Sequence, residues 1–293
     1  MRHKDERRDD ACGGNATPPM GGPNLSELVT LLNQTFTLPG DFPRLRGSAS
    51  RHLGEVIMKK ILGLAVLATV ATAGVASAEG TVTANVQLTS DYVFRGVSLS
   101  DNGPALQGGV DYVADAWYAG VWGSNVTEGL ELDVYAGITP TTGPVDWDLG
   151  VIGYFYPGAD DDGAEFDYYE LKVGASHDFT DQLTAGAAVY YAPENFGDTG
   201  DATYWEVNAS YEITDAIAIN GAYGNQTIEE PNGPNSEDDY NTWNVGVGWA
   251  MHGFQVDLRY HDSDIDEGTD IANYAYGESS HDSAFVVTIG REL

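Results

Sequence analysis

Acidic residues recur at every second position along several stretches of this sequence, a spacing that could line a channel or hold cations. Glu131 and Asp133 form one such pair, and Asp146 and Asp148 form another. Alternate side chains of an extended strand point to the same face, so each pair belongs to an acidic row. A row of one charge sign concentrates potential and attracts counter-ions. Cation handling is therefore the first chemistry to consider.

A dedicated calcium loop is not expected. The stretch 262–270, DSDIDEGTD, has aspartates at alternate positions, but Glu267 stands where an EF-hand requires glycine, and Asn273 stands where it requires glutamate. Acid-rich loops such as this one and 160–162 are usually solvated. We predict no metal site, with a looser divalent site in these loops as the alternative.

Two histidines have neighbours that could assist hydrolysis. His261 precedes Asp262, and His281 precedes Asp282 and Ser283. A catalytic triad needs these groups to converge in space, whereas successive residues of a strand point to opposite faces. We therefore expect ordinary loop histidines and no enzyme, and keep a barrel hydrolase as a lesser alternative.

Composition excludes several classes of function. From residue 79 onward the 293-residue chain has four basic residues and 38 acidic ones, a net charge of −34. Such a surface repels nucleic acid. The single cysteine, Cys12, precedes everything that looks folded, so thiol chemistry and disulfides are excluded there. No cofactor is expected.

An export signal is predicted at an internal start, over residues 58–78. Met58 is followed by two lysines, an apolar stretch over 61–73, and the small residues 76–78 before Glu79. An uncleaved anchor is the alternative, but the apolar segment is short for a membrane span and no stop-transfer charges follow. Residues 1–57 are expected to be an upstream extension, or a disordered segment.

Residues 79–293 are predicted to be an all-β, transmembrane, antiparallel up-and-down barrel of about twelve strands. Stretches of about ten residues alternate apolar and polar side chains, and short connections alternate with long ones, as in outer-membrane barrels. The connection 127–129 is an exception, because it is short among the long ones. The expected strands are 81–94, 105–114, 117–126, 130–139, 145–156, 166–177, 182–192, 203–213, 216–226, 241–250, 253–261 and 283–293.

Aromatic residues gather near the ends of these strands, as expected at the two borders of a lipid bilayer. At the long-loop end they are Tyr92, Phe94, Tyr154–Tyr156, Phe166, Tyr168, Tyr169, Tyr190, Tyr191, Tyr204, Trp205, Tyr223, Trp243 and Tyr260; at the other end they are Trp117, Trp147, Phe179, Tyr211, Trp249 and Phe254. A soluble periplasmic sandwich or lipocalin-like barrel is the alternative, but its outward face should be polar.

Several linked motifs resemble the TorF family of porin-like outer-membrane proteins. They are SDYVFRG at 90–96, LSD at 99–101 with Pro104, QGG at 107–109, YAGVWGSNV at 118–126, ELDVYAGI at 131–138 and YFYPGA at 154–159. The resemblance spans 79–293 and implies location in the bacterial outer membrane, with lipid and lipopolysaccharide around the barrel. It suggests passive transport and supplies no catalytic or ligand residues.

If the apolar face meets lipid, mainly acidic side chains line the lumen. The predicted pore-lining residues are Asp111, Glu131, Asp133, Asp146, Asp148, Glu170, Lys172, Glu206, Asp257 and Arg259, with Glu212 on the same face. A conducting barrel with this lining should prefer cations. We therefore predict a porin for small hydrophilic solutes or cations. The alternative is a plugged barrel with a structural or surface-binding role, because twelve strands leave modest room inside.

Asp91 and Arg95 are predicted at the outer mouth of the pore. Arg95 is either a constriction or ligand residue, or the partner of Asp91 in a structural ion pair, and the second reading is favoured because an arginine among many acids readily finds a carboxylate. The oligomeric state and the solute are not predicted.

Overall fold

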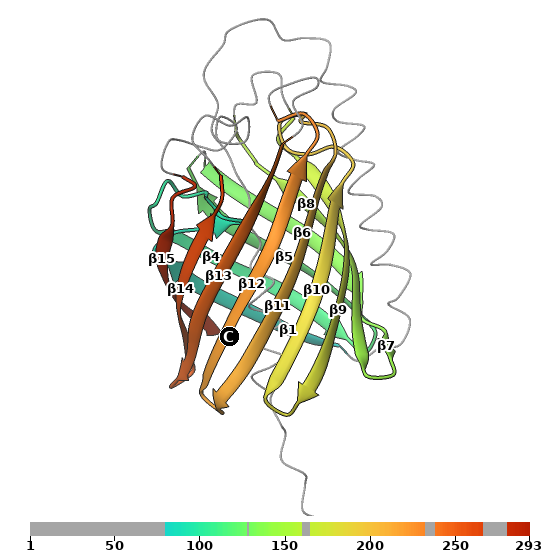
Figure 1. Cartoon of the computed structure of the whole chain (residues 1–293), viewed down its shortest axis with the longest axis vertical. Helices are drawn as coiled ribbons and strands as arrows, with labels where there is room; N and C mark the ends of the chain where they lie inside the picture. Colours follow the sequence, from blue (N-terminus) through green and yellow to red (C-terminus); the bar gives the residue numbers. More distant parts are fainter. Residues whose placement is uncertain (1–79, 128, 160–164, 232–237, 266–279) are drawn as a thin grey trace, which may run out of the picture.

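Alternating side chains produce long antiparallel strands that close into a barrel in this computed structural model (Figure 1). The structure describes residues 80–127, 129–159, 165–231, 238–265 and 280–293. Within these ranges no helix is long and apolar enough to cross a membrane. The long strands are β1 (Thr81–Thr89), β4 (Ala105–Ala114), β5 (Trp117–Val126), β6 (Gly129–Ile138), β8 (Val145–Phe155), β9 (Tyr168–Thr180), β10 (Leu183–Ala192), β11 (Ala202–Thr214), β12 (Ile217–Ile228), β13 (Asp238–Met251), β14 (Phe254–Ser263) and β15 (Ala284–Glu292).

Some neighbouring strands of the barrel are not joined by a simple hairpin. β1 pairs with both β4 and β15, which joins the first strand to the last, and β6 pairs with β8. Three further strands are short: β2 (Val93–Phe94), β3 (Val97–Ser98) and β7 (Thr141–Thr142), and β7 extends only β8. The prediction of a twelve-stranded antiparallel barrel is confirmed.

Short connections gather at one end of the barrel, which we call the turn end, and the opposite end is called the loop end. Turns 115–116, 181–182, 215–216 and 252–253 lie at the turn end, together with the start of β1 and the end of β15 (Figure 1). The exception at the loop end is the connection between β5 and β6, where Gly129 has a φ of 127°. This left-handed region is open to glycine.

The outward face carries exposed apolar side chains from one end of the barrel to the other. Leu88, Val173, Val247 and Ile289 are between 43% and 55% exposed. Aromatic residues border this apolar band: Tyr169, Tyr191, Trp205 and Tyr223 toward the loop end, and Trp147, Phe179, Tyr211, Trp249 and Phe254 toward the turn end. A water-facing barrel would carry polar side chains here, so the exterior fits lipid chains.

The predicted aromatic border is wrong for several residues, because their rings lie inside the barrel. Tyr92, Phe94, Tyr154, Tyr156, Phe166, Tyr168 and Tyr204 are buried. The expected first strand, 81–94, is also too long, since β1 ends at Thr89. The chain then turns inward through the short hairpin β2–β3, which places Tyr92 and Phe94 in the interior.

The predicted signal peptide 58–78 and the upstream segment 1–57 lie outside the described residues, as do the acidic loop 160–162 and most of 262–270.

Candidate functional site: the barrel interior

The inward face gathers the predicted pore-lining residues, at different depths of burial. Glu131, Asp133, Glu170 and Lys172 are buried. Five others are partly buried: Asp111, Asp148, Glu206, Asp257 and Arg259. Asp146 is exposed beside β7, where it accepts a hydrogen bond from Thr141. Apart from Asp146, the predicted residues are thus buried or partly buried, and their role as a pore lining stays a prediction.

The interior toward the loop end is occupied by residues 90–104, which we call the inner segment. Asp91 accepts hydrogen bonds from the hydroxyls of Ser98 (2.6 Å) and Ser100 (3.0 Å). The backbone nitrogen of Leu99 donates to the carbonyl of Tyr92 at 2.7 Å. These bonds fold the segment back on itself. The predicted Asp91–Arg95 ion pair is therefore wrong, because Asp91 holds the base of this fold.

The tip of the inner segment is a tight turn that needs left-handed backbone at two residues. Arg95 has a φ of 44° and Gly96 a φ of 87°, as in the two-residue turns that suit hairpin twist. A Cβ on Gly96 would lie 2.9 Å from the Thr242 hydroxyl and from the Ser263 Cβ. Glycine is thus required both by the backbone and by the wall of β13 and β14.

Arg95 reaches from this tip to the opposite wall. Its Nη1 and Nη2 each donate to an oxygen of Glu170 on β9 at 2.8 Å, and Nη1 also donates to Gln226 on β12 at 2.9 Å. The guanidinium carbon lies 4.3 Å from the ring centre of Tyr204 and 4.4 Å from that of Phe94. The prediction placed Arg95 at the outer mouth, but the structure places it inside, with its side chain 7% exposed.

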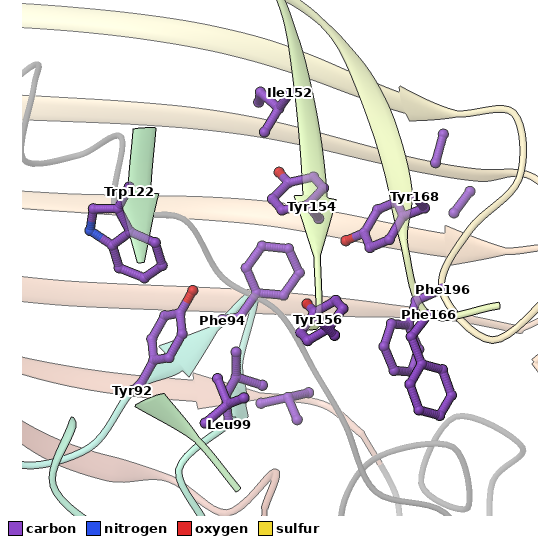
Figure 2. Packing of buried hydrophobic residues seen from close by; sticks show 14 of the residues in the cluster. Tyr92, Phe94, Leu99, Trp122, Ile152, Tyr154, Tyr156, Phe166, Tyr168 and Phe196 are labelled. Carbon is purple, nitrogen blue, oxygen red and sulfur yellow. The ribbon is translucent and has the colours of Figure 1, made fainter. Parts of the chain in front are cut away.

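Aromatic rings pack around the inner segment (Figure 2). Tyr92 meets Trp122 edge to face, with ring centres 5.6 Å apart, and Tyr154 stacks on Tyr168 at 4.7 Å. Phe196, from the β10–β11 connection, stacks on Phe166 at 4.7 Å. The inner segment and these rings fill the interior toward the loop end, where the sequence predicted pore-lining side chains, with a plugged barrel as the alternative.

Tyrosine hydroxyls serve as partners for many of the acids. Tyr92 and Tyr156 donate to Glu131 at 2.9 and 3.1 Å, and Tyr154 donates to Glu170 at 3.0 Å. Further such bonds join Tyr118 to Asp148, Tyr135 to Asp111, and Tyr204 to Glu206. A phenol satisfies a carboxylate without cancelling its charge. The interior thus remains acidic although its carboxylates are hydrogen-bonded.

Toward the turn end the interior is polar, and its side chains are buried or partly buried. Arg259 donates to Asn220 and Asn244 at 2.5 and 2.6 Å and forms a salt bridge of 3.0 Å with Asp257. Lys172 pairs with Asp148 at 2.5 Å. The barrel thus has a packed aromatic half and a hydrophilic half.

The tyrosines and Gln226 are functional candidates that the sequence reading missed. Tyr154 lies an even number of residues from Asp148, and Tyr168 from Glu170. Counting by twos would therefore have assigned these rings to the interior.

The histidine pairs do not form a visible triad among the described residues. His261 lies on the inward face of β14, whereas Asp262 lies on the outward face and accepts a hydrogen bond from Tyr260 at 2.8 Å. His281 is buried, while Asp282 and Ser283 are exposed. No three His, Cys, Asp or Glu side chains of the described part converge in a way that could hold a metal ion.

Residues 73–293 match the model of a family described as "Bacterial protein of unknown function (Gcw_chp)". No curated protein matches the sequence.

Several similar solved structures are described as porins or outer-membrane proteins. A KdgM porin is 9% identical with a TM-score of 0.47, covering 71% of this chain and 98% of its own. Salmonella typhi OmpF, in complex with daunomycin, is 8% identical with a TM-score of 0.44, covering 74% and 98%. The outer membrane protein opdK of Pseudomonas aeruginosa is 13% identical with a TM-score of 0.40, covering 65% and 58%. With every score below 0.5, the function proposed below rests on this chain's own residues.

Proposed function

This chain belongs to the Gcw_chp family of bacterial proteins of unknown function, and we propose that it is a cation-preferring outer-membrane pore for small hydrophilic solutes. The apolar exterior with its aromatic borders supports location in the outer membrane, where the barrel would contact lipid and lipopolysaccharide. The polar turn-end half supports a water-filled vestibule. In this proposal the inner segment forms the constriction. The resemblance to the TorF family agrees with this role, and the family name itself stays a prediction.

One observation carries the cation preference. Three bases of the described part face inward, and each is paired with a carboxylate: Arg95 with Glu170, Lys172 with Asp148 and Arg259 with Asp257. Inward acids of the described part that form no salt bridge include Asp91, Asp111, Glu131, Asp133 and Glu206. Excess charge of one sign on a low-dielectric wall attracts counter-ions and repels co-ions.

The test is planar-bilayer conductance of the refolded full chain across a KCl gradient, after heat-dependent gel mobility has shown that the barrel is folded. Stepwise conductance with a reversal potential of the cation-selective sign is expected. Conductance that favours chloride would refute the preference while leaving the pore.

A closed barrel with a structural or surface-binding role is the second candidate, and the packing around the inner segment favours it. Tyr92, Phe94 and Leu99 are each no more than 7% exposed. If a barrel shown to be folded passes no current, the closed-barrel role is supported. If it passes current, that role is excluded.

A further inference from the structure

Asp133 is a fully buried acid to which no described residue donates a hydrogen bond. It is 0% exposed, and both of its carboxylate oxygens lack a partner within the described part of the chain. It lies on the inward face of β6, directly across from Trp122 of β5 and Tyr154 of β8. Residues paired in this way have Cβ atoms about 5 Å apart. The carboxylate is therefore flanked by two aromatic residues.

The donors around this acid bind to its neighbours. The hydroxyl of Tyr92 donates to Glu131, and the hydroxyl of Tyr154 donates to Glu170. The guanidinium of Arg95 directs both of its terminal nitrogens at Glu170. These donors therefore leave the Asp133 carboxylate unsatisfied.

The charges of this group do not balance. Glu131, Asp133 and Glu170 are at most 1% exposed, and among the described residues only Arg95 forms a salt bridge with one of them. An uncompensated buried ion is strongly unfavourable. Asp133 must therefore hold either a proton or a cation.

The surroundings indicate which cation would fit. No three His, Cys, Asp or Glu side chains of the described part converge on one point, whereas calcium takes six to eight oxygens. Aromatic faces attract cations through the ring quadrupole, most effectively when the cation is desolvated. Potassium and ammonium give up water more readily than sodium, so they suit one carboxylate between rings.

We propose that Asp133, with the rings of Trp122 and Tyr154, binds a weakly hydrated monovalent cation, potassium or ammonium, inside the barrel. The site rests on the proposed cation preference in that it identifies the favoured ions. Binding can nevertheless be measured on a barrel that passes no current.

The experiment measures thermal unfolding of the folded full chain in detergent, with heat-dependent gel mobility as the readout. Potassium, ammonium or sodium chloride replaces N-methylglucamine chloride at constant ionic strength. A ligand that binds the folded state raises the melting temperature in a saturable way. We expect saturable shifts with potassium and ammonium, a smaller shift with sodium, and loss of the shifts in Asp133→Asn. Asp215→Asn, in an exposed turn, is the matched control and should keep them.

Infrared spectroscopy covers the case in which Asp133→Asn does not fold. In the wild type, replacing N-methylglucamine by potassium should shift a carboxylate stretching band. A protonated-carboxyl band that is the same in every salt, or melting temperatures that ignore the cation, would overturn the site. Potassium-dependent melting without current would refute the pore and keep the site, and selective current without cation-dependent melting would do the reverse.

Discussion

Arg95 and Glu170 meet in a two-point contact, with both nitrogen–oxygen distances at 2.8 Å, although they are 75 residues apart in the sequence. The arginine comes from the tip of the inner segment and the glutamate from the wall strand β9. This contact fastens the segment across the lumen, so its strength should govern both stability and flow through the barrel.

Replacing Arg95 by alanine should destabilise the barrel and increase conductance. Removing one partner of a buried ion pair leaves the other charge uncompensated, at a cost of about 3–5 kcal/mol. Urea unfolding in lipid vesicles measures the stability, and single-channel recording measures the current. Arg291→Ala is the control, because Arg291 packs against Phe254 on the outside. Unchanged current in a folded Arg95→Ala barrel would contradict a constricting role.

The pair itself can be isolated with a double-mutant cycle. Arg95→Gln and Glu170→Gln should each destabilise the barrel, while the double variant should lose less than the sum, because no unpaired charge remains. Strict additivity of the unfolding free energies would mean that the two side chains do not interact.

Gly96→Ala should distort the turn that carries Arg95. The positive φ strains any other residue, by about 1–3 kcal/mol, and the new methyl group would press on Thr242 and Ser263. Gly143→Ala is the matched control: its φ is 63°, but nothing lies within 4 Å of the added atom. Urea unfolding should therefore show a larger loss for Gly96→Ala, and equal losses would leave backbone strain as the whole effect.

Glu206→Gln should weaken cation selectivity with little change in stability. Glu206 accepts hydrogen bonds from Tyr204 and Asn208 and has no salt bridge among the described residues, so the amide removes charge while keeping the shape. The reversal potential in a dilute KCl gradient should move toward zero, and the difference should shrink in concentrated salt because of screening. Asp215→Asn, in an exposed turn, should behave like the wild type. A shift of equal size in that control would point to general surface charge instead.

An arginine substituted on the outward face should lower the stability of the barrel more in the middle of a strand than near the turn end. Val173 lies in the middle of β9 and is 50% exposed, whereas Ile213 lies near the turn end of β11 and is 51% exposed. A lipid-facing arginine costs about 2–4 kcal/mol at the membrane midplane and about 0–1 near its border. Unfolding of Val173→Arg and Ile213→Arg in lipid vesicles tests this gradient. Equal costs would argue against lipid around the barrel.

The strands and their two faces could be predicted from the sequence because a barrel wall repeats one simple rule. Each residue needs only its position in the alternation to be assigned to lipid or interior, and Glu131, Asp133 and Glu170 were placed correctly in this way. The turn-end connections followed from their shortness.

The inner segment could not be predicted from the same rule. The apolar alternation through Val86 and Leu88 is interrupted only at Ser90 before Tyr92 and Phe94, so the sequence favours a longer first strand with interfacial rings. Arg95–Gly96 is the local turn signal. The contact between Arg95 and Glu170 depends on how strands distant in sequence are arranged around the ring, and this arrangement is not visible in any one stretch.

The pairing of β1 with β15 sets a condition on assembly. Every strand of the wall finds both its neighbours only after the carboxyl-terminal residues have docked against the amino-terminal strand, with Leu88 opposite Ile289. Until β1 and β15 have paired, β1 has an open edge whose backbone groups can pair with another chain. The last nine-residue strand thus determines when the barrel closes, however early the other hairpins form.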